Sequence, residues 1–123
     1  MFEIYFDGGC KPNPGAMEIC IYSKDKTIVK HERLGHGTNN EAEWMALLYV
    51  LEVCNSAGQQ HIKVYGDSQL VINQATGLWQ TKQDSLKIYK KTYDDMKGMF
   101  KKIELQYVAR AKNLAGIHIE ENN

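Results

Sequence analysis

Three acidic residues occupy positions from which their side chains could meet. Asp7 and Asp67 lie at or just beyond the ends of predicted strands, and Glu43 lies in the first turn of a predicted helix. Each also has an ordinary explanation. Asp7 precedes two glycines and could be a turn residue. Glu43 could form a capping box with Asn40. Asp67 could cap a helix that begins at Ser68.

Taken together, these residues indicate a metal site. Three converging carboxylates repel one another unless a cation lies among them, and oxygen ligands without Cys or His suit Mg²⁺ or Mn²⁺. Two such ions about 3.5–4 Å apart catalyse displacement at phosphorus, because one activates water and the other stabilises the leaving oxygen. The sequence shows no Ser/His/Asp nucleophile system. Gly8-Gly9 lacks the further glycines that nucleotide-binding fingerprints require.

The elements that position these residues are expected in the order βββαβααβα, which is typical of a mixed sheet covered by helices. Alternating apolar residues indicate strands, and three- and four-residue spacings indicate helices. The predicted strands are Phe2–Phe6, Met17–Tyr22, Thr27–Leu34, His61–Tyr65 and Ile103–Val108. The predicted helices are Glu41–Cys54, capped by Asn39 or Asn40, then Ser68–Gln74, Ser85–Phe100 and a short helix from Leu114.

Length and composition limit the class of protein. A chain of 123 residues, 43% apolar and 24% charged, is typical of one globular domain, here residues 1–123. The longest apolar run, Ala46–Val53, is too short and too polar to cross a bilayer. The N-terminal residues show no secretory signal, so we expect no membrane partner. Three cysteines without metal-like spacing indicate reduced thiols and a cytoplasmic location.

The charge pattern is neutral overall but uneven along the chain. Fifteen basic and fifteen acidic residues cancel, which by itself makes no case for a nucleic-acid partner. Between Lys82 and Lys102, however, the sequence contains seven lysines and only three aspartates. The ordinary explanation is a solvated helix face, and the alternative is a positive edge for nucleic acid.

Three motifs resemble those of the type I ribonuclease H family. They are Tyr5–Cys10 with Asn13-Pro14-Gly15, the T-N-N-x-x-E pattern of Thr38–Glu43, and the D-S-Q motif within Gly66–Val71. Their order and separations match, and the resemblance covers essentially the whole chain. It implies an α/β ribonuclease H fold, with a five-stranded mixed sheet in the order 3-2-1-4-5 and helices on both faces.

The resemblance also implies an activity and a set of contacts. The activity is hydrolysis of the RNA strand of RNA–DNA hybrids by two Mg²⁺ or Mn²⁺ ions held by the three carboxylates, leaving 5′-phosphate and 3′-hydroxyl ends. A minor groove that displays RNA 2′-hydroxyls is expected to contact Gly8, Gly9, Cys10, Asn39, Asn40 and Gln69. A DNA phosphate is expected to contact Asn13 and Thr38. The ordinary alternative for the asparagines is turn or cap formation.

The segment after the predicted helix Ser68–Gln74 departs from the family. Leu78–Lys82 passes almost directly into the next helix and leaves no room for the lysine-rich protrusion of many relatives. Trp79 either stacks along the DNA backbone or packs on the core. Lys82, together with Lys87 and Lys90, forms the expected positive edge, so affinity should be modest and salt-sensitive.

The fourth acidic position of the family is also altered. Relatives usually place an aspartate at the start of the last helix, but no aspartate follows Asp95. We expect Asn113 to take this catalytic and metal-binding position. The alternatives are that Asn113 is only a helix cap, or that Glu120 or Glu121 supplies the acid. The family's loop histidine is missing as well, and neither His118 nor Arg110 is assigned a catalytic role.

The sequence therefore predicts a monomeric, metal-dependent endoribonuclease acting on RNA–DNA hybrids. Two alternatives remain open. One is a nuclease of double-stranded RNA on the same fold, because a fold does not fix its substrate. The other is a hybrid-binding module weakened by loss of the fourth acid.

Overall fold

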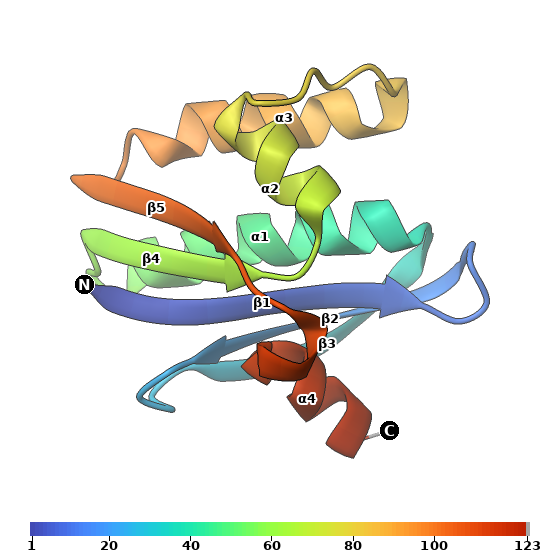
Figure 1. The fold of residues 1–123 in the computed structure, drawn as a ribbon, viewed down its shortest axis with the longest axis horizontal. Coiled ribbons are helices and arrows are strands. Elements are labelled where there is room, and N and C mark those ends of the chain that lie inside the picture. The colour runs from blue at the N-terminus through green and yellow to red at the C-terminus, as the bar shows by residue number, and fades with distance from the viewer. Residues whose placement is uncertain (123) are drawn as a thin grey trace.

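A five-stranded mixed sheet organises residues 1–122, the part of the chain that the computed structural model describes (Figure 1). The strands are β1 (Phe2–Cys10), β2 (Gly15–Ser23), β3 (Val29–Gly37), β4 (His61–Gly66) and β5 (Lys102–Tyr107). They lie in the order β3-β2-β1-β4-β5. The first three form an antiparallel meander, and β4 and β5 run parallel to β1. The predicted strand order is confirmed.

Helices cover both faces of this sheet, as expected. Figure 1 shows α1, α2 and α3 on one side and α4 on the other. Their bounds are α1 (Asn39–Ser56), α2 (Gln69–Thr76), α3 (Asp84–Lys97) and α4 (Leu114–Glu121), with a short 3₁₀ turn, η1 (Arg110–Lys112), before α4. No helix within residues 1–122 has both the length and the apolar character needed to span a membrane.

Successive side chains of β1 point to opposite faces of the sheet, so they pack in two separate hydrophobic clusters. Ile4 and Phe6 are fully buried in the larger core, which also contains Trp44 of α1. Tyr5 points to the other face and packs against a smaller cluster that includes Ala115 of α4. Both helices therefore pack against the same central strand, and they bring residues from distant parts of the sequence beside it.

Strand β1 is longer than predicted, which corrects the expected position of Asp7. Asp7 lies inside the strand and is paired with Cys20 of β2, and the pairing continues to Cys10. On the other edge, the parallel pairing with β4 stops at Tyr5 opposite Tyr65. Because β4 ends while β1 continues, Asp7 still lies beside the end of β4, where Asp67 follows.

Helix α1 begins differently from the prediction. Its N-cap is Thr38, not Asn39 or Asn40. The Thr38 hydroxyl accepts a hydrogen bond from the backbone N–H of Glu41, and the Glu41 carboxylate accepts one from the Thr38 N–H. This capping box satisfies two backbone donors. The box uses Glu41, so the capping explanation for Glu43 is wrong and the Glu43 side chain is available for another role.

Candidate active site

One carboxylate oxygen from each of Asp7, Glu43 and Asp67 lies within 4.8 Å of the others. Asp7 comes from the central strand, Glu43 from α1 just beyond its first turn, and Asp67 from the residue after β4. Within residues 1–122 this is the one group of His, Cys, Asp or Glu with such geometry. The cap of α2 is Ser68, whose hydroxyl accepts from the Val71 N–H, so Asp67 does not serve as that cap.

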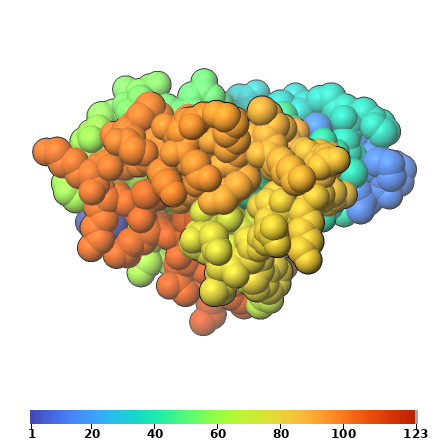
Figure 2. Space-filling view, turned by 90° about the horizontal axis from the view of Figure 1, so that it is seen from above, coloured from blue at the N-terminus to red at the C-terminus, as the bar shows by residue number. Residues whose placement is uncertain are grey.

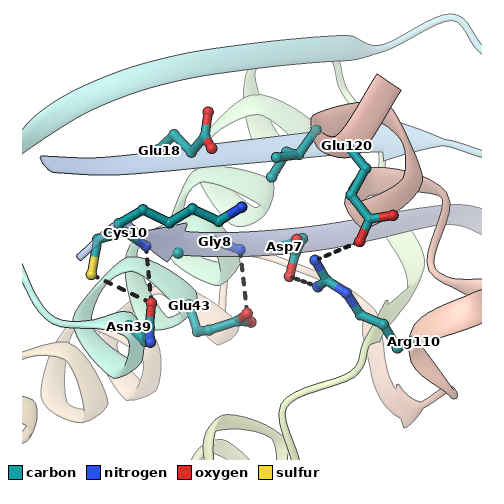
Figure 3. Close-up of a pocket in the computed structure, with 11 residues that line it drawn as sticks. Asp7, Gly8, Cys10, Glu18, Asn39, Glu43, Arg110 and Glu120 are labelled. Atoms are coloured by element: carbon teal, nitrogen blue, oxygen red, sulfur yellow. Dashed lines mark hydrogen bonds and ion pairs between the residues drawn. The ribbon is translucent and has the colours of Figure 1, made fainter. Parts of the chain in front are cut away.

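Gly8 allows the helix and the strand to come this close. A Cβ atom at Gly8 would lie 2.4 Å from the carbonyl oxygen of Ala42, closer than real Cβ contacts allow. Because glycine has no Cβ, the first turn of α1 packs directly on β1. The Gly8 N–H then donates to Glu43 Oε1 at 3.4 Å (Figure 3). This close packing brings Glu43 of α1 beside Asp7 of β1.

The local electrostatics favour a bound cation. Burial raises the pKa of Asp7, and burial together with the charge of Asp7 raises the pKa of Glu43 well above its ordinary value. Oε2 of Glu43 is buried and has no hydrogen-bond partner within residues 1–122. A buried carboxylate oxygen without a partner is unfavourable unless a cation or proton compensates it. The three carboxylates therefore suit a divalent ion that prefers oxygen ligands.

Arg110, to which sequence reasoning assigned no role, reaches this cluster from η1. Its Nη1 donates to Asp7 Oδ1 at 2.8 Å and to Asp67 Oδ2 at 3.1 Å. Its Nη2 donates to Glu120 Oε1 at 3.4 Å (Figure 3). The sequence held one signal for this role. Arg110 lies between β5 and α4, and this segment passes the end of β4, where Asp67 lies.

A hollow of about 460 Å³ lies beside the carboxylates, and its lining includes Asp7, Gly8, Gly9, Cys10, Asn39, Glu43, Arg110 and Glu120. We call this hollow together with the three carboxylates the acidic pocket. Four of the predicted substrate contacts, Gly8, Gly9, Cys10 and Asn39, therefore line the same hollow as Asp7 and Glu43. Sequence reasoning kept Glu120 only as an alternative, because nothing in its local sequence separates it from Glu121.

Hydrogen bonds order the far side of the acidic pocket. Oδ1 of Asn39 accepts from the Cys10 N–H at 2.9 Å, and the Asn39 N–H donates to Asn13 Oδ1 at 3.0 Å. Asn13 therefore ties the loop after β1 to the start of α1. Asn40 and Gln69, in the first turns of α1 and α2, are exposed. Their predicted contacts with nucleic acid stay predictions.

Asn113 is the N-cap of α4 and is fully buried. Its Oδ1 accepts from the backbone N–H groups of Ala115 and Gly116, and its Nδ2 donates to the carbonyl oxygen of Phe6. Both ends of the amide are therefore occupied within the protein. This is the arrangement that the helix-cap alternative predicts, and it leaves the metal-ligand hypothesis without a free amide oxygen.

Trp79 and Lys82 lie in the segment between α2 and α3, and neither lines the acidic pocket. Figure 2 shows this segment, in yellow, on the surface beside α3, in orange. Trp79 is 44% exposed and lines a second hollow with Lys87 and Lys90. We call Trp79, Lys82, Lys87 and Lys90 the lysine edge. Within it, Lys87 pairs with Asp84 at 3.0 Å and Lys90 with Asp94 at 2.9 Å.

One protein-family model matches most of the chain. A family model described as Reverse transcriptase-like matches residues 6–117. The ribonuclease HI of Halobacterium salinarum is 35% identical over 113 residues, covering 89% of this chain and 57% of that protein. The matched stretches cover between 31% and 57% of the curated relatives, so the chain spans about a third to just over half of their length.

Solved structures show the same architecture. The crystal structure of RNase H1 from the halophilic archaeon Halobacterium salinarum superposes with a TM-score of 0.87 at 31% identity, covering 95% of this chain and 92% of that one. LC11-RNase H1, solved in complex with an RNA/DNA hybrid, gives a TM-score of 0.85 at 27% identity, covering 93% of this chain and 89% of that one.

Proposed function

Because the chain belongs to the type I ribonuclease H family, we propose that it is an endonuclease that hydrolyses the RNA strand of RNA–DNA hybrids. The products would carry 5′-phosphate and 3′-hydroxyl ends. The observation that carries the proposal is the convergence of Asp7, Glu43 and Asp67 around a buried carboxylate oxygen of Glu43 that has no hydrogen-bond partner among residues 1–122. A binding module has no use for three clustered negative charges beside a phosphate backbone.

The three carboxylates are the proposed ligands for Mg²⁺ or Mn²⁺. The ions would supply an activated water and would stabilise the leaving oxygen. The protein's own part is to hold the carboxylates at fixed positions before the substrate arrives. Strand β1 holds Asp7, and the capping box at Thr38 fixes the first turn of α1, directly before Glu43.

Selection of RNA is proposed to occur along the backbone of Gly8, Gly9 and Cys10 and the amides of Asn39, Asn40 and Gln69. Amide groups both donate and accept, which suits contacts with 2′-hydroxyls. Because the Cys10 N–H occupies Asn39 Oδ1, the Asn39 NH₂ group is the end available to substrate. We propose that Asn13 and Thr38 approach a DNA phosphate and that the lysine edge follows the DNA strand.

In this proposal Asn113 acts as a positioning residue for α4 and does not bind metal, because its amide oxygen is already used twice. We further propose that residues 1–123 act as one monomeric domain in the cytoplasm. The three cysteines are free and buried, in keeping with a reducing compartment.

The direct test uses labelled RNA–DNA, RNA–RNA and DNA–DNA duplexes incubated with Mg²⁺ or Mn²⁺. We expect cleavage of the RNA strand of the hybrid, and its loss after chelation or in Asp67→Asn. Cleavage of RNA–RNA at a similar rate would support the double-stranded RNA alternative. Hybrid binding without any cleavage, equal in the wild type and in Asp67→Asn, would support the binding-module alternative.

A further inference from the structure

A single nitrogen of Arg110 connects the two aspartates of the acidic pocket. Nη1 lies 2.8 Å from Asp7 Oδ1 and 3.1 Å from Asp67 Oδ2. Asp7 lies in β1 and Asp67 directly follows β4, so the guanidinium joins two elements across the cluster. Figure 3 shows the contact with Asp7. The side chain is nevertheless 53% exposed, which leaves it room to move toward solvent.

The bridge occupies one oxygen of each aspartate, Asp7 Oδ1 and Asp67 Oδ2, and a divalent ion shared by these two oxygens would need the same place. Mg²⁺ binds carboxylate oxygens at about 2.0–2.1 Å, and any ion that contacts both aspartate oxygens must lie between them. A guanidinium nitrogen already within hydrogen-bond distance of both oxygens cannot remain there at the same time. Like charges at such a separation would also repel strongly in a partly buried site.

Two neighbouring residues accommodate the guanidinium. A Cβ atom at Gly116 of α4 would lie 3.1 Å from Arg110 Nη1 and 3.3 Å from Asp7 Oδ2, so the missing side chain leaves space for this contact. Glu120, one turn further along α4, accepts from Arg110 Nη2 at 3.4 Å. Glu120 lies at the exposed rim of the pocket and can keep the guanidinium after Nη1 leaves the aspartates.

We propose that Arg110 is a built-in competitor of the metal: it bridges Asp7 and Asp67 in the metal-free protein, and a divalent ion must displace it toward Glu120. This inference rests on the proposed metal site. Arg110 is thus a positioning residue that stabilises the carboxylates before the ion arrives and reduces the apparent affinity for the ion. Loss of the guanidinium leaves the three carboxylates uncompensated, which strengthens their attraction for a divalent ion.

The test measures metal binding without nucleic acid. Isothermal titration calorimetry with Mn²⁺ and Mg²⁺ compares the wild type, Arg110→Gln and the matched control Lys112→Gln, which removes an exposed cation from the same turn. We expect the dissociation constant to fall by about three- to tenfold in Arg110→Gln and to change less than twofold in Lys112→Gln. An unchanged or weaker affinity in Arg110→Gln, or no binding in either protein, would overturn the proposal.

Melting temperature supplies a second measurement. Metal-free Arg110→Gln should melt several degrees below the wild type, and saturating Mn²⁺ should remove most of this difference, because at a given ion concentration the protein with the lower dissociation constant is stabilised more. A structural ion pair unrelated to metal would instead give the same difference with and without Mn²⁺. That result would contradict the competition.

The side-chain resonance of Arg110 reports its position directly. In ¹⁵N spectra of the wild type, the Arg110 Nε–H signal, identified by its loss in Arg110→Gln, should shift when saturating diamagnetic Mg²⁺ is added to the metal-free protein. The shift should be absent in Asp7→Asn. None of these measurements requires cleavage, so a protein that binds ions competitively but cuts no hybrid would refute the proposed function and leave this inference standing.

Discussion

In the acidic pocket three carboxylates lie within 4.8 Å of one another, whereas along α3 the lysines Lys87, Lys90 and Lys91 each pair with an aspartate on the same helix. The pocket leaves negative charge incompletely compensated in a buried place, and the helix neutralises much of its positive charge on the surface. Exposed ion pairs contribute little and are screened by salt. We therefore expect chemistry to depend on the pocket and binding to depend only moderately on the lysine edge.

The largest difference between the two regions should appear in the cleavage rate. Asp7→Asn removes a carboxylate charge from the pocket and should lower the rate at least about 100-fold, because one metal ligand is worth several kcal/mol. The matched control is Asp84→Asn, which breaks the pair with Lys87 at the lysine edge and should stay within about twofold of the wild type. Rates should be measured on a labelled hybrid at saturating Mg²⁺. Retention of more than about a tenth of the rate in Asp7→Asn would remove the distinction between the regions.

The next effect is on stability and concerns the cap at the edge of the pocket. Asn113→Ala removes two acceptor contacts and the hydrogen bond donated to the Phe6 carbonyl, so the free energy of unfolding should fall by about 2–3 kcal/mol. Urea unfolding checks this value, with exposed Asn55→Ala as the control, for which a change below about 0.5 kcal/mol is expected.

Asn113→Asp separates the cap from the metal-ligand hypothesis. A fourth ligand would make this variant equally or more active at low Mg²⁺, because it adds a charge to the site. A cap predicts an unchanged dependence of rate on Mg²⁺. Measuring rate against Mg²⁺ for this variant together with its melting temperature decides between the two.

A smaller effect is expected from the raised pKa of Glu43. Burial and the charge of Asp7 raise this pKa well above 4.5, so the folded state holds a proton that the unfolded state has lost. Stability of the metal-free protein is therefore greatest at low pH within this window and falls as pH rises through the folded-state pKa. Glu43→Gln should remove this decline and raise stability at pH 7 by about 1–2 kcal/mol.

The measurement for Glu43 is urea unfolding in the presence of chelator between pH 4.5 and 8. The control is Glu52→Gln, an exposed glutamate of the same helix, which should leave the pH profile unchanged. A Glu43→Gln variant less stable than the wild type at pH 7 would mean that the carboxylate is not strained by its surroundings.

The smallest effects should come from the lysine edge. Single Lys82→Ala, Lys87→Ala and Lys90→Ala changes should weaken hybrid binding by at most about 1 kcal/mol each and reduce its salt dependence. The strand that is cleaved should not change, since phosphate contacts carry no selection for RNA. Fluorescence anisotropy at several salt concentrations checks this, with Lys24→Ala as the control. Salt-independent binding would contradict the prediction.

The parts of the fold that the sequence predicted are those that depend on local pattern. Alternation in β1 and the D-S-Q motif after β4 identified the strands beside which Asp7 and Asp67 lie, and the spacing of apolar residues located α1 and α3. The end of β1 was missed, because residues Gly8–Cys10 are glycine-rich and form a strand only through pairing with β2. Such pairing depends on a partner that local propensity does not reveal.

Parts of the site that depend on tertiary contacts could not be predicted. Thr38 and Asn40 are both acceptable caps in sequence, and only the reciprocal contact with Glu41 selects Thr38. Arg110 lies 103 residues from Asp7, and their contact requires α4 to pack on the face of the sheet opposite α1. Asn113 matched a family position by spacing, but its burial and its bond to the Phe6 carbonyl arise only after folding.

Gly8 gives mutational scanning an unusual target in this protein. A standard alanine scan removes atoms and measures what they contributed, but at Gly8 alanine adds a methyl group to a space that the Ala42 carbonyl already fills. That addition would push α1 from β1 and carry Glu43 away from Asp7 without altering any acidic residue. A scan that interprets every alanine as the loss of a side chain would misread Gly8, where the site depends on the absence of a side chain.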